Sequence, residues 1–350
     1  MFSVVLMALQ SALLIGFAIT SSSLIDHAHA DFWITPKGTR DVDQSSDLTE
    51  RRRYQALAVP EVVSAQKLIV KFAPWKRPDG GVETVIVVGI DPDHPAVAPW
   101  NFETGSIDAL RIPNGIVIDR LYAEKLGIER LGETVEINAH RARVAAFTSG
   151  IRAFTQAPYI FASLKTAQTM TEMPTDRVTY IVVTAKAGAE LATIEQALQR
   201  RFPDFDVWRA SSFAWQTRKY WLLTTGAGVA LVIAAVLGLI VGIVIVAQTL
   251  YSATVERLPE YATLRAMGAW HDYLHRIILK QSSLGAGLGY GLGMLVTGLA
   301  MVAARDGTAA LLLPWQAVLA LGVITFLMCG SGAIISIRKV LKIDPVMVFK

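Results

Sequence analysis

Four long stretches of the chain contain no Asp, Glu, Lys or Arg, and segments of mixed polarity separate them. A helix of about 20 apolar residues crosses the hydrocarbon core of a bilayer, so each stretch is long enough to span a membrane. The charge-free stretches are residues 1–25, 220–255, 281–304 and 307–337. The pattern predicts an α-helical membrane protein with four transmembrane helices and a large α+β extracytoplasmic domain between helices 1 and 2.

The same pattern sets the expected boundaries along the chain. We expect transmembrane helix 1 at 1–25, a periplasmic α+β domain of two lobes at 26–218, transmembrane helix 2 with a stalk at 219–250, a cytosolic coupling loop at 251–280, transmembrane helix 3 at 281–304, transmembrane helix 4 at 312–337 and a cytosolic tail at 338–350.

Within the polar segment, short β-rich runs are interrupted by Gly, Pro and Asp, as in strands joined by turns. We expect strands at 31–35, 62–72, 82–90, 115–118, 178–184 and 204–209, a hairpin over 134–147, and helices at 48–57, 119–126 and 189–201. One lobe is expected to come from the two ends of the segment and the other from its middle.

The second charge-free stretch is too long for a single crossing. Residues 220–250 would make a helix of roughly 46 Å at about 1.5 Å per residue, whereas the hydrocarbon core is about 30 Å thick. We therefore expect a helical stalk outside the membrane. Trp215, Tyr220 and Trp221 would lie at the outer interface, where amphipathic aromatic rings are enriched.

Basic residues near the spans set the expected orientation. Short loops rich in Lys and Arg stay in the cytosol. The segment 250–280 carries four such residues and the tail from Arg338 carries another four. The connection between the third and fourth stretches contains a single basic residue, Arg305. We expect a multi-pass protein of the bacterial inner membrane with cytosolic N- and C-termini, and with residues 26–218 outside.

The first stretch is either an anchor or a cleaved signal peptide. Ala28-His29-Ala30 resembles the small-x-small site of a signal peptidase. However, residues 1–25 lack the basic n-region of a signal peptide and exceed its apolar core of about 7–15 residues. These observations favour a retained helix. The missing basic flank is consistent with a natural start upstream of Met1.

Composition narrows the class of function. Charged residues make up 18% of the 350 residues, below the ~25% of ordinary soluble domains. Residues 26–218 hold 23 basic and 24 acidic side chains, and the rest of the chain holds 10 basic and 5 acidic side chains. Because the basic excess lies beside membrane segments, topology explains it and we expect no nucleic-acid partner. The single cysteine, Cys329, excludes an intrachain disulfide.

No constellation for catalysis or metal binding stands out. Walker A, nucleophile-elbow and zincin patterns do not occur in the sequence. His27 and His29 with their acidic neighbours, and the run Asp91-Pro92-Asp93-His94, lack known metal-ligand spacings. The four charge-free stretches also lack the ionisable residues of ion-coupled transporters. We expect no enzyme activity and no cofactor on this chain, with energy entering at the cytosolic loop.

Glycines recur at helical spacing in two of the expected spans. Small residues four apart lie on one face of a helix and let another helix approach closely. The predicted helix-packing residues are Gly238 and Gly242 in the second span, and Gly285, Gly289 and Gly293 in the third.

The cytosolic loop carries an apolar helical stripe of Leu264, Met267, His271, Leu274 and Ile278. The stripe fits an amphipathic helix that lies on lipid headgroups. It also fits a helix that docks on a partner protein.

The loop sequence favours docking. Glu260-x-x-x-x-Arg265-Ala266-x-Gly268-Ala269, followed by an aliphatic lead into a glycine-rich span, resembles the FtsX-like permease domain of MacB-type ABC transporters. Asp344-Pro345 and the short tail after it are similar to the C-terminal end of that family, and Asp31-Phe32-Trp33-Ile34 fits its start after the first span. The order of one span, an external domain and three further spans resembles the family over the whole chain.

The resemblance implies a homodimeric permease subunit driven by a cytosolic ABC ATPase dimer, with ATP bound by that partner. It implies that the loop docks on the ATPase through Glu260, Arg265 and Gly268, with Leu264 and Met267 beside them. The stalk would transmit the movement to the external domain, for export or extraction of a substrate. A periplasmic adaptor and an outer-membrane channel are further expected partners, besides membrane lipid.

MacB itself carries its ATPase on the same chain, so here a separate ATPase is expected. Two rival interpretations remain open at this point. One is an FtsX-like regulator of an external hydrolase, and the other is a membrane-anchored sensor.

Overall fold

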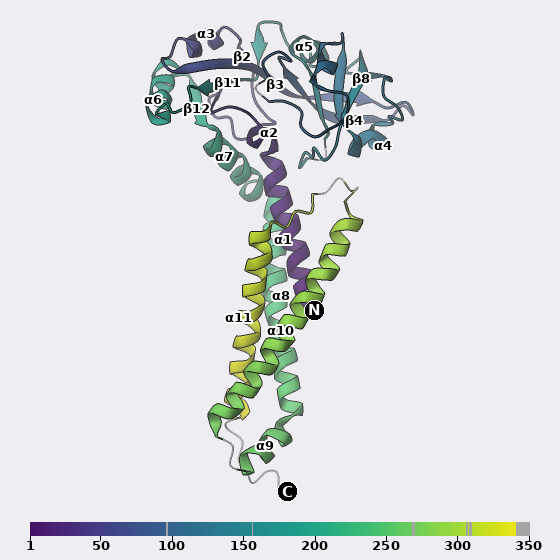
Figure 1. Cartoon of the computed structure of the whole chain (residues 1–350). Helices are drawn as coiled ribbons and strands as arrows, with labels where there is room; N and C mark the ends of the chain where they lie inside the picture. Colours follow the sequence, from purple (N-terminus) through teal and green to yellow (C-terminus); the bar gives the residue numbers. More distant parts are fainter. Residues whose placement is uncertain (96, 156, 268–269, 306, 308–309, 341–350) are drawn as a thin grey trace. The chain divides into compact units, whose positions relative to one another are not determined.

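The computed structural model describes residues 1–340 except 96, 156, 268–269, 306 and 308–309 (Figure 1). The chain divides into two compact units. The polar unit comprises Phe17–Gly228 together with residues 306–310. The helical unit comprises Met1–Gly16, Val229–Arg305 and the chain from residue 311 onward.

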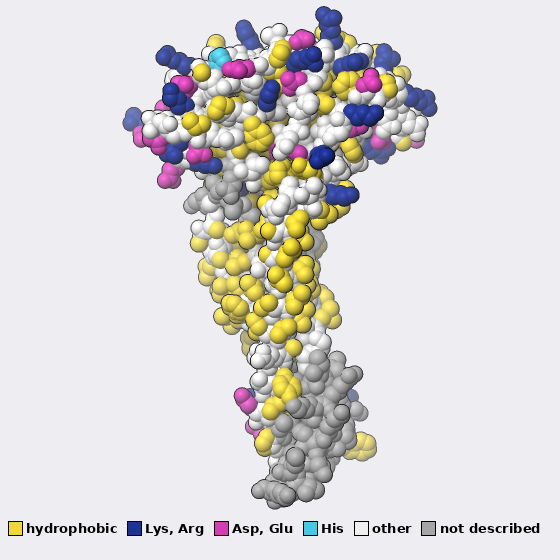
Figure 2. Space-filling view, turned by 180° about the vertical axis from the view of Figure 1, so that it is seen from behind, with side chains coloured by type: hydrophobic (Ala, Val, Ile, Leu, Met, Phe, Trp, Pro, Cys, Tyr) yellow, Lys and Arg dark blue, Asp and Glu magenta, His cyan; other side chains and the backbone are white. Residues whose placement is uncertain are grey.

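Long apolar helices build the helical unit. They are α1 (Phe2–Ser21), α8 (Gly226–Glu256), α10 (His271–Ala303) and α11 (Trp315–Val340), and the short α9 (Leu258–Ala266) precedes α10. In the described part of the chain, four helices are long and apolar enough to cross a membrane, which confirms the predicted number. Exposed apolar side chains such as Val236, Leu288 and Val323 cover their outer faces, as contact with lipid tails requires (Figure 2).

The first helix packs inside the helical unit. Val4 and Met7 of α1 are buried in one cluster with Leu321 and Met328 of α11. Hydrogen bonds also join α10 to α11, because the Tyr290 hydroxyl donates to the Val318 carbonyl at 2.6 Å. Such interhelical bonds add to van der Waals packing where no water competes.

Strands and short helices alternate in the polar unit, as the sequence pattern indicates. Its strands are β1 (Phe32–Pro36), β2 (Leu48–Thr49), β3 (Val62–Lys76), β4 (Val82–Ile90), β5 (Phe102–Thr104), β6 (Gly115–Asp119), β7 (Thr134–Ile137), β8 (His140–Thr148), β9 (Tyr159–Ser163), β10 (Arg177–Val178), β11 (Tyr180–Ala185) and β12 (Phe205–Arg209). Its helices are α2 (Ser23–Asp26), α3 (Arg52–Leu57), η1 (Ile107–Arg111), η2 (Arg120–Tyr122), α4 (Ala123–Leu126), α5 (Leu164–Met170), α6 (Leu191–Arg201) and α7 (Ala210–Leu223). The α+β class of this domain is therefore confirmed.

One twisted sheet runs through the polar unit. The strand order is β12-β1-β11-β3-β4-β9-β6-β8-β5, and β7 pairs with both β3 and β8. The 15-residue β3 pairs with β11 along its first half and with β4 along its second half. Strands from the two ends of the segment thus lie on one side of β3 and the middle strands on the other. The two predicted lobes share a single sheet through this long strand.

Both faces of the sheet are buried at the central strands β4, β6, β9 and β11, where alternate residues enter different cores. In β4, Val85 and Val87 belong to the core under α3, α5 and α6, whereas Ile86 and Val88 belong to the core under α2 and α7 (Figure 1). The second core contains Leu24 of α2 as well. This alternation is the period of two that a strand imposes on its side chains.

Some predicted boundaries differ from the structure. The single helix expected over 220–250 is wrong, because α7 ends at Leu223 and α8 begins at Gly226. The helices α8 and α10 also extend into the segment 251–280 that was assigned to the loop. The predicted helix at 48–57 begins as the strand β2, and the helix at 119–126 begins with the 3₁₀ turn η2. The tail from residue 341 lies outside the described residues.

Candidate functional site at the junction of the polar unit

The two ends of the polar unit meet beside each other. The first strand, β1, pairs antiparallel with the last strand, β12, so that Phe32 lies opposite Arg209 and Pro36 opposite Phe205. The chain enters the polar unit through α1 and α2 and leaves it through α7. Pairing of β1 with β12 brings α2 and α7 into contact.

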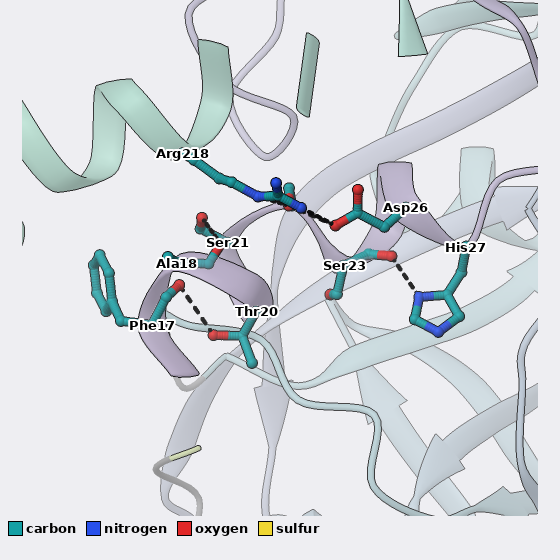
Figure 3. Close-up of polar contacts among 9 residues, drawn as sticks. Phe17, Ala18, Thr20, Ser21, Ser23, Asp26, His27 and Arg218 are labelled. Atoms are coloured by element: carbon teal, nitrogen blue, oxygen red, sulfur yellow. Dashed lines mark hydrogen bonds and ion pairs between the residues drawn. The ribbon is translucent and has the colours of Figure 1, made fainter. Parts of the chain in front are cut away.

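An arginine from α7 joins these two segments. Arg218 donates through its guanidinium to Asp26 Oδ2 at 2.6 Å and, through Nε, to the Ser22 hydroxyl at 2.8 Å (Figure 3). The Ser22 hydroxyl itself donates to Asp26 Oδ2 at 2.7 Å. We call Ser22, Asp26 and Arg218 the junction. The side chains of Arg218 and Asp26 are 31% and 35% exposed, so water screens the pair only in part.

A run of hydroxyl residues explains why the helix breaks before the junction. The Thr20 hydroxyl donates to the Phe17 carbonyl and the Ser21 hydroxyl to the Ala18 carbonyl (Figure 3). Such bonds to the preceding turn compete with the helical hydrogen bonds and commonly bend or end a helix. Accordingly, α1 ends at Ser21 and the one-turn helix α2 follows.

The turn between α7 and α8, where the chain leaves the polar unit, is fixed by specific contacts; we call it the corner. Between α7 and α8, the Thr225 hydroxyl donates to the Trp221 carbonyl at 2.6 Å and accepts from the Gly228 N–H at 3.2 Å. A Cβ atom at Gly228 would overlap the Trp221 carbonyl oxygen. The close approach of the two helices at this corner therefore requires glycine.

An aromatic cluster connects the segment that enters the polar unit, α1, with the segment that leaves it, α7. The Phe154 ring lies 5.4 Å from the Phe17 ring of α1 and 4.1 Å from the Trp221 ring of α7, between ring centroids. The loop that carries Phe154 is fixed by Asp119, whose Oδ2 accepts from the Thr148 hydroxyl and from the Ile151 N–H at 2.7 Å. Burial raises the pKa of the Asp119 carboxyl, and these hydrogen bonds oppose that effect.

The first histidine after the first helix, His27, takes part in the packing around the junction. His27 Nδ1 donates to the Ser23 carbonyl at 2.8 Å, and its ring stacks on Trp100 at 3.8 Å. Ala28 forms a β-bridge with Val97. The carboxylate of Asp31 accepts from the Ala185 N–H at 2.8 Å. No group of three or more His, Cys, Asp or Glu side chains suited to a metal ion occurs in the described part of the chain.

The predicted coupling residues lie around α9. Glu260 is exposed, Leu264 is half-buried and the Met267 side chain is 72% exposed. Arg265 belongs to α9, but its side chain and Gly268 lie outside the described residues. Their role in docking stays a prediction.

The predicted packing glycines differ in what they meet. A Cβ atom at Gly238 would overlap the Gln10 side chain of α1, and one at Gly242 would lie 2.9 Å from Met7 Sδ. On α10, a Cβ at Gly293 would lie 2.8 Å from Val4 Cβ, and one at Gly289 would lie 3.4 Å from the Met1 nitrogen, whereas one at Gly285 would meet nothing within 4 Å. The nearest atoms that a Cβ would meet at these glycines belong to α1 or to Met1 just before it.

Sequence reasoning did not find the junction. A signal was nevertheless present, because Asp26 is the first charge after the first charge-free stretch and Arg218 lies two residues before the second. Charged residues at the two ends of one external segment are candidates for pairing when the first and last strands of that segment are neighbours.

Two family models match the chain in succession. Residues 1–201 match the family model of the MacB-like periplasmic core domain. Residues 220–345 match that of the FtsX-like permease C-terminal region.

Individual relatives are more distant. An uncharacterized ABC transporter permease protein of Mycobacterium tuberculosis, Rv0987, is 27% identical over 191 residues, which are 53% of this chain and 21% of that protein. The match thus spans about a fifth of the length of this relative. The periplasmic region of MacB from Actinobacillus actinomycetemcomitans is similar over 53% of this chain and 92% of its own, with 14% identity and a TM-score of 0.40. The extracellular domain of the noncanonic ABC-type transporter YknZ from Gram-positive bacteria covers 51% of this chain and 98% of its own, with 14% identity and a TM-score of 0.37.

The first family model alone covers more than half of the chain, and the second covers most of the remainder. Both parts also carry the expected architecture, a large α+β domain and four apolar helices. The chain belongs to the family of multi-pass ABC transporter permeases that join a MacB-like periplasmic core domain to an FtsX-like permease region.

Proposed function

We propose that this chain is the permease subunit of an ABC system in the bacterial inner membrane, with both termini in the cytosol and the polar unit outside. A separate cytosolic ATPase dimer binds and hydrolyses ATP, and the permease converts this into movement of the polar unit. The movement exports a substrate or extracts it from the membrane. The observation that carries the proposal is the junction, where Arg218 joins the entering and leaving segments of the polar unit.

The junction supports mechanical transmission for a simple physical reason. The polar unit continues into an apolar helix on each side, into α1 before α2 and into α8 after α7. Because α2 and α7 are joined by charge-assisted hydrogen bonds, a displacement of one segment is shared by the other. Phe154 adds an apolar contact to both segments. The polar unit is thereby suited to move as one body.

The spans themselves offer no other route for energy. Proton- or ion-driven transporters use ionisable side chains inside the membrane. In α1 no Asp, Glu, Lys or Arg occurs, and in α8, α10 and α11 such residues occur only near one end of each helix. Movement driven from the cytosolic side is the alternative that this composition favours.

The proposed ATPase contact is α9 with the residues that follow it. Met267 and Trp270 are 72% and 83% exposed, and large apolar side chains that are exposed together mark an interaction surface. In the proposal, Leu264 and Met267 enter an apolar cleft of the ATPase and Arg265 pairs with an acidic group there. Loss of one partner from a buried charge pair costs about 2–5 kcal/mol, whereas loss of a basic residue at a lipid surface costs only about 1 kcal/mol.

The partner set follows from this scheme. An ATPase dimer presents two equivalent docking surfaces, so the proposal includes a second copy of this chain. Export across an outer membrane would add a periplasmic adaptor and an outer-membrane channel, and extraction from the inner membrane would not need the channel.

The test is to purify the tagged chain in detergent and to identify and quantify the ATPase that co-purifies. Arg265→Glu and Met267→Glu should each abolish this association. Arg276→Glu, an exposed position of α10 outside the motif, is the matched control and should retain most of it. Retention of the ATPase by both loop variants would contradict the docking assignment. Absence of any ATPase from the wild-type preparation would favour a membrane-anchored sensor.

A further inference from the structure

Two carboxyl groups are buried in the loop between β1 and β2. Asp41 and Asp43 are 1% and 2% exposed. Asp41 Oδ1 accepts from the backbone N–H groups of Asp43 and Gln44, both at 3.0 Å. Asp43 Oδ1 accepts from the Tyr159 hydroxyl at 3.1 Å, and Asp43 Oδ2 is buried without a hydrogen-bond partner. We call residues 41–43 the acidic loop.

In the described part of the chain, no cation is among the groups that act on Asp43, whereas Arg152 and Asp119 act on the neighbouring Tyr122. Within the described part of the chain, the titratable groups that act on Asp43 or its partners are Asp41 in the same loop, Tyr159 of β9, Tyr180 of β11 and Tyr122 of η2. Burial raises the pKa of Asp43 to about 7, and the Asp41 charge adds to this, whereas the Tyr159 hydrogen bond opposes it. Burial also raises the pKa of Asp41 to about 6. A buried carboxylate that lacks a paired cation is strongly disfavoured relative to the neutral acid.

The acidic loop belongs to the core that carries the junction helices. Val42 is fully buried in the core that also contains Leu24 of α2 and Phe213 of α7. The Tyr180 hydroxyl donates to the Val42 carbonyl at 2.8 Å, and the Tyr180 ring lies 6.1 Å from the Phe213 ring. Tyr180 therefore contacts both the acidic loop and α7, the helix that carries Arg218 of the junction.

We propose that the acidic loop is a proton-binding site that makes the packing of α7 on the sheet depend on external pH. With Asp43 neutral, the loop stays buried and Tyr180 holds its position against Phe213. When Asp43 releases its proton to solvent water, the carboxylate draws residues 41–43 toward water. The contact of Tyr180 with α7 then loosens. The site would regulate the transmission proposed above, but its physical test does not depend on an ATPase.

The sign of the effect follows from the direction of the shift. The pKa of Asp43 in the folded chain, about 7, lies above its ordinary value of 3.8. Stabilisation by the neutral acid is thus complete below about pH 4, falls as pH rises and is lost above about pH 7. Asp41 contributes in the same direction over the lower part of that window, up to about pH 6. Acidification should therefore protect the loop and α7, and mild alkalinisation should loosen them.

The experiment is hydrogen exchange measured by mass spectrometry on the full chain in detergent, from about pH 5 to about pH 9, corrected for intrinsic exchange rates. These limits bracket the pKa of about 7. In the wild type, peptides covering residues 37–47 and 210–223 should lose protection together with a midpoint near pH 7. Asp43→Asn, which cannot ionise, should abolish that transition. Asp204→Asn, an exposed position of the same unit, is the control and should leave it unchanged.

Two further variants keep the test decisive if Asp43→Asn folds poorly. Asp41→Asn removes the neighbouring negative charge and should lower the midpoint by about half a pH unit or more. Tyr159→Phe removes the hydroxyl that favours the ionised carboxylate and should raise the midpoint. A wild-type chain without a transition would overturn the proposal. So would an unchanged transition in Asp43→Asn, or midpoint shifts of Asp41→Asn and Tyr159→Phe in the same direction.

Discussion

The Arg218–Asp26 pair should contribute a measurable coupling free energy to the polar unit. Its N–O distance is 2.6 Å, and about a third of each side chain is exposed. Fully exposed ion pairs are worth about 0.2–1 kcal/mol, whereas hydrogen bonds to charged groups in less exposed settings are worth about 1.5–3 kcal/mol. The geometry lies between these cases, and the Ser22 hydroxyl adds a second acceptor for Arg218. We therefore expect a coupling energy of about 1–2 kcal/mol.

The assay is a double-mutant cycle of Arg218→Gln and Asp26→Asn, followed by thermal unfolding of the chain in detergent. Each kcal/mol should lower the unfolding temperature by about 2–4 °C in a unit of this size. The double variant should lose less than the sum of the two single variants, because each single variant already breaks the pair. Raising the salt concentration should reduce the coupling only in part, since water reaches only a third of the pair.

A second ion pair in the same unit is a matched control. Arg209 and Glu195 are also 2.6 Å apart, with side chains 37% and 26% exposed, but they join β12 to α6. Their cycle should give a similar coupling energy. Only the Arg218 and Asp26 variants should reduce the ATP-dependent change in hydrogen exchange of the polar unit when the ATPase is bound. A coupling energy near zero at the junction, or equal loss of the ATP response in both sets, would refute the reasoning.

Three further predictions concern the corner, the helix packing and the N-terminus. Gly228→Ala should destabilise the chain by about 1–3 kcal/mol in thermal unfolding, because its Cβ overlaps the Trp221 carbonyl, whereas the neighbouring Gly226→Ala should be tolerated. Gly293→Leu should lower the unfolding temperature through its contact with α1, and Gly285→Leu, which meets open space, should not; equal effects would argue against packing on α1. N-terminal sequencing of the membrane-extracted protein should find the first helix retained, and a chain that begins at residue 31 would contradict this.

Local periodicity was enough to predict much of the fold. The strand predicted over 82–90 coincides with β4, and the one over 31–35 overlaps β1, because both combine apolar, β-prone side chains with nearby turn residues. The four apolar helices followed from the absence of charge alone. Signals of this kind depend on neighbouring residues, so a sequence shows them directly.

Other elements depend on contacts that the sequence does not display. The strand β9 is only five residues long and is buried on both faces between β4 and β6, so it lacks the polar alternation of a half-exposed strand. The break between α7 and α8 falls inside a charge-free stretch, and Thr225 and Gly228 form hydrogen bonds there. Neither residue interrupts the hydrophobic pattern, and a continuous helix was therefore the natural expectation.

The candidate site also depends on contacts between residues far apart in the sequence, and local patterns did not predict it. Arg218 and Asp26 are 192 residues apart, and although each lies beside a charge-free stretch, no local pattern pairs the two residues. Their contact follows from the antiparallel pairing of β1 with β12. That pairing, in turn, depends on the order of strands in the whole sheet. Site residues of this type become predictable only after the topology is known.

The position of the junction has a mechanical consequence for the polar unit. Because α2 and α7 are in contact, both of its connections to apolar helices leave from one place rather than from opposite ends of the sheet. A displacement imposed through separate attachment points would stretch the sheet between them, whereas one imposed at a single place moves the sheet without deforming it. Leu24 of α2 and Phe213 of α7 are fully buried against the sheet, so under the proposed function a displacement would reach the strands through close packing. For the proposed mechanical function, we therefore expect substitutions at the junction to impair movement of the polar unit more than its folding.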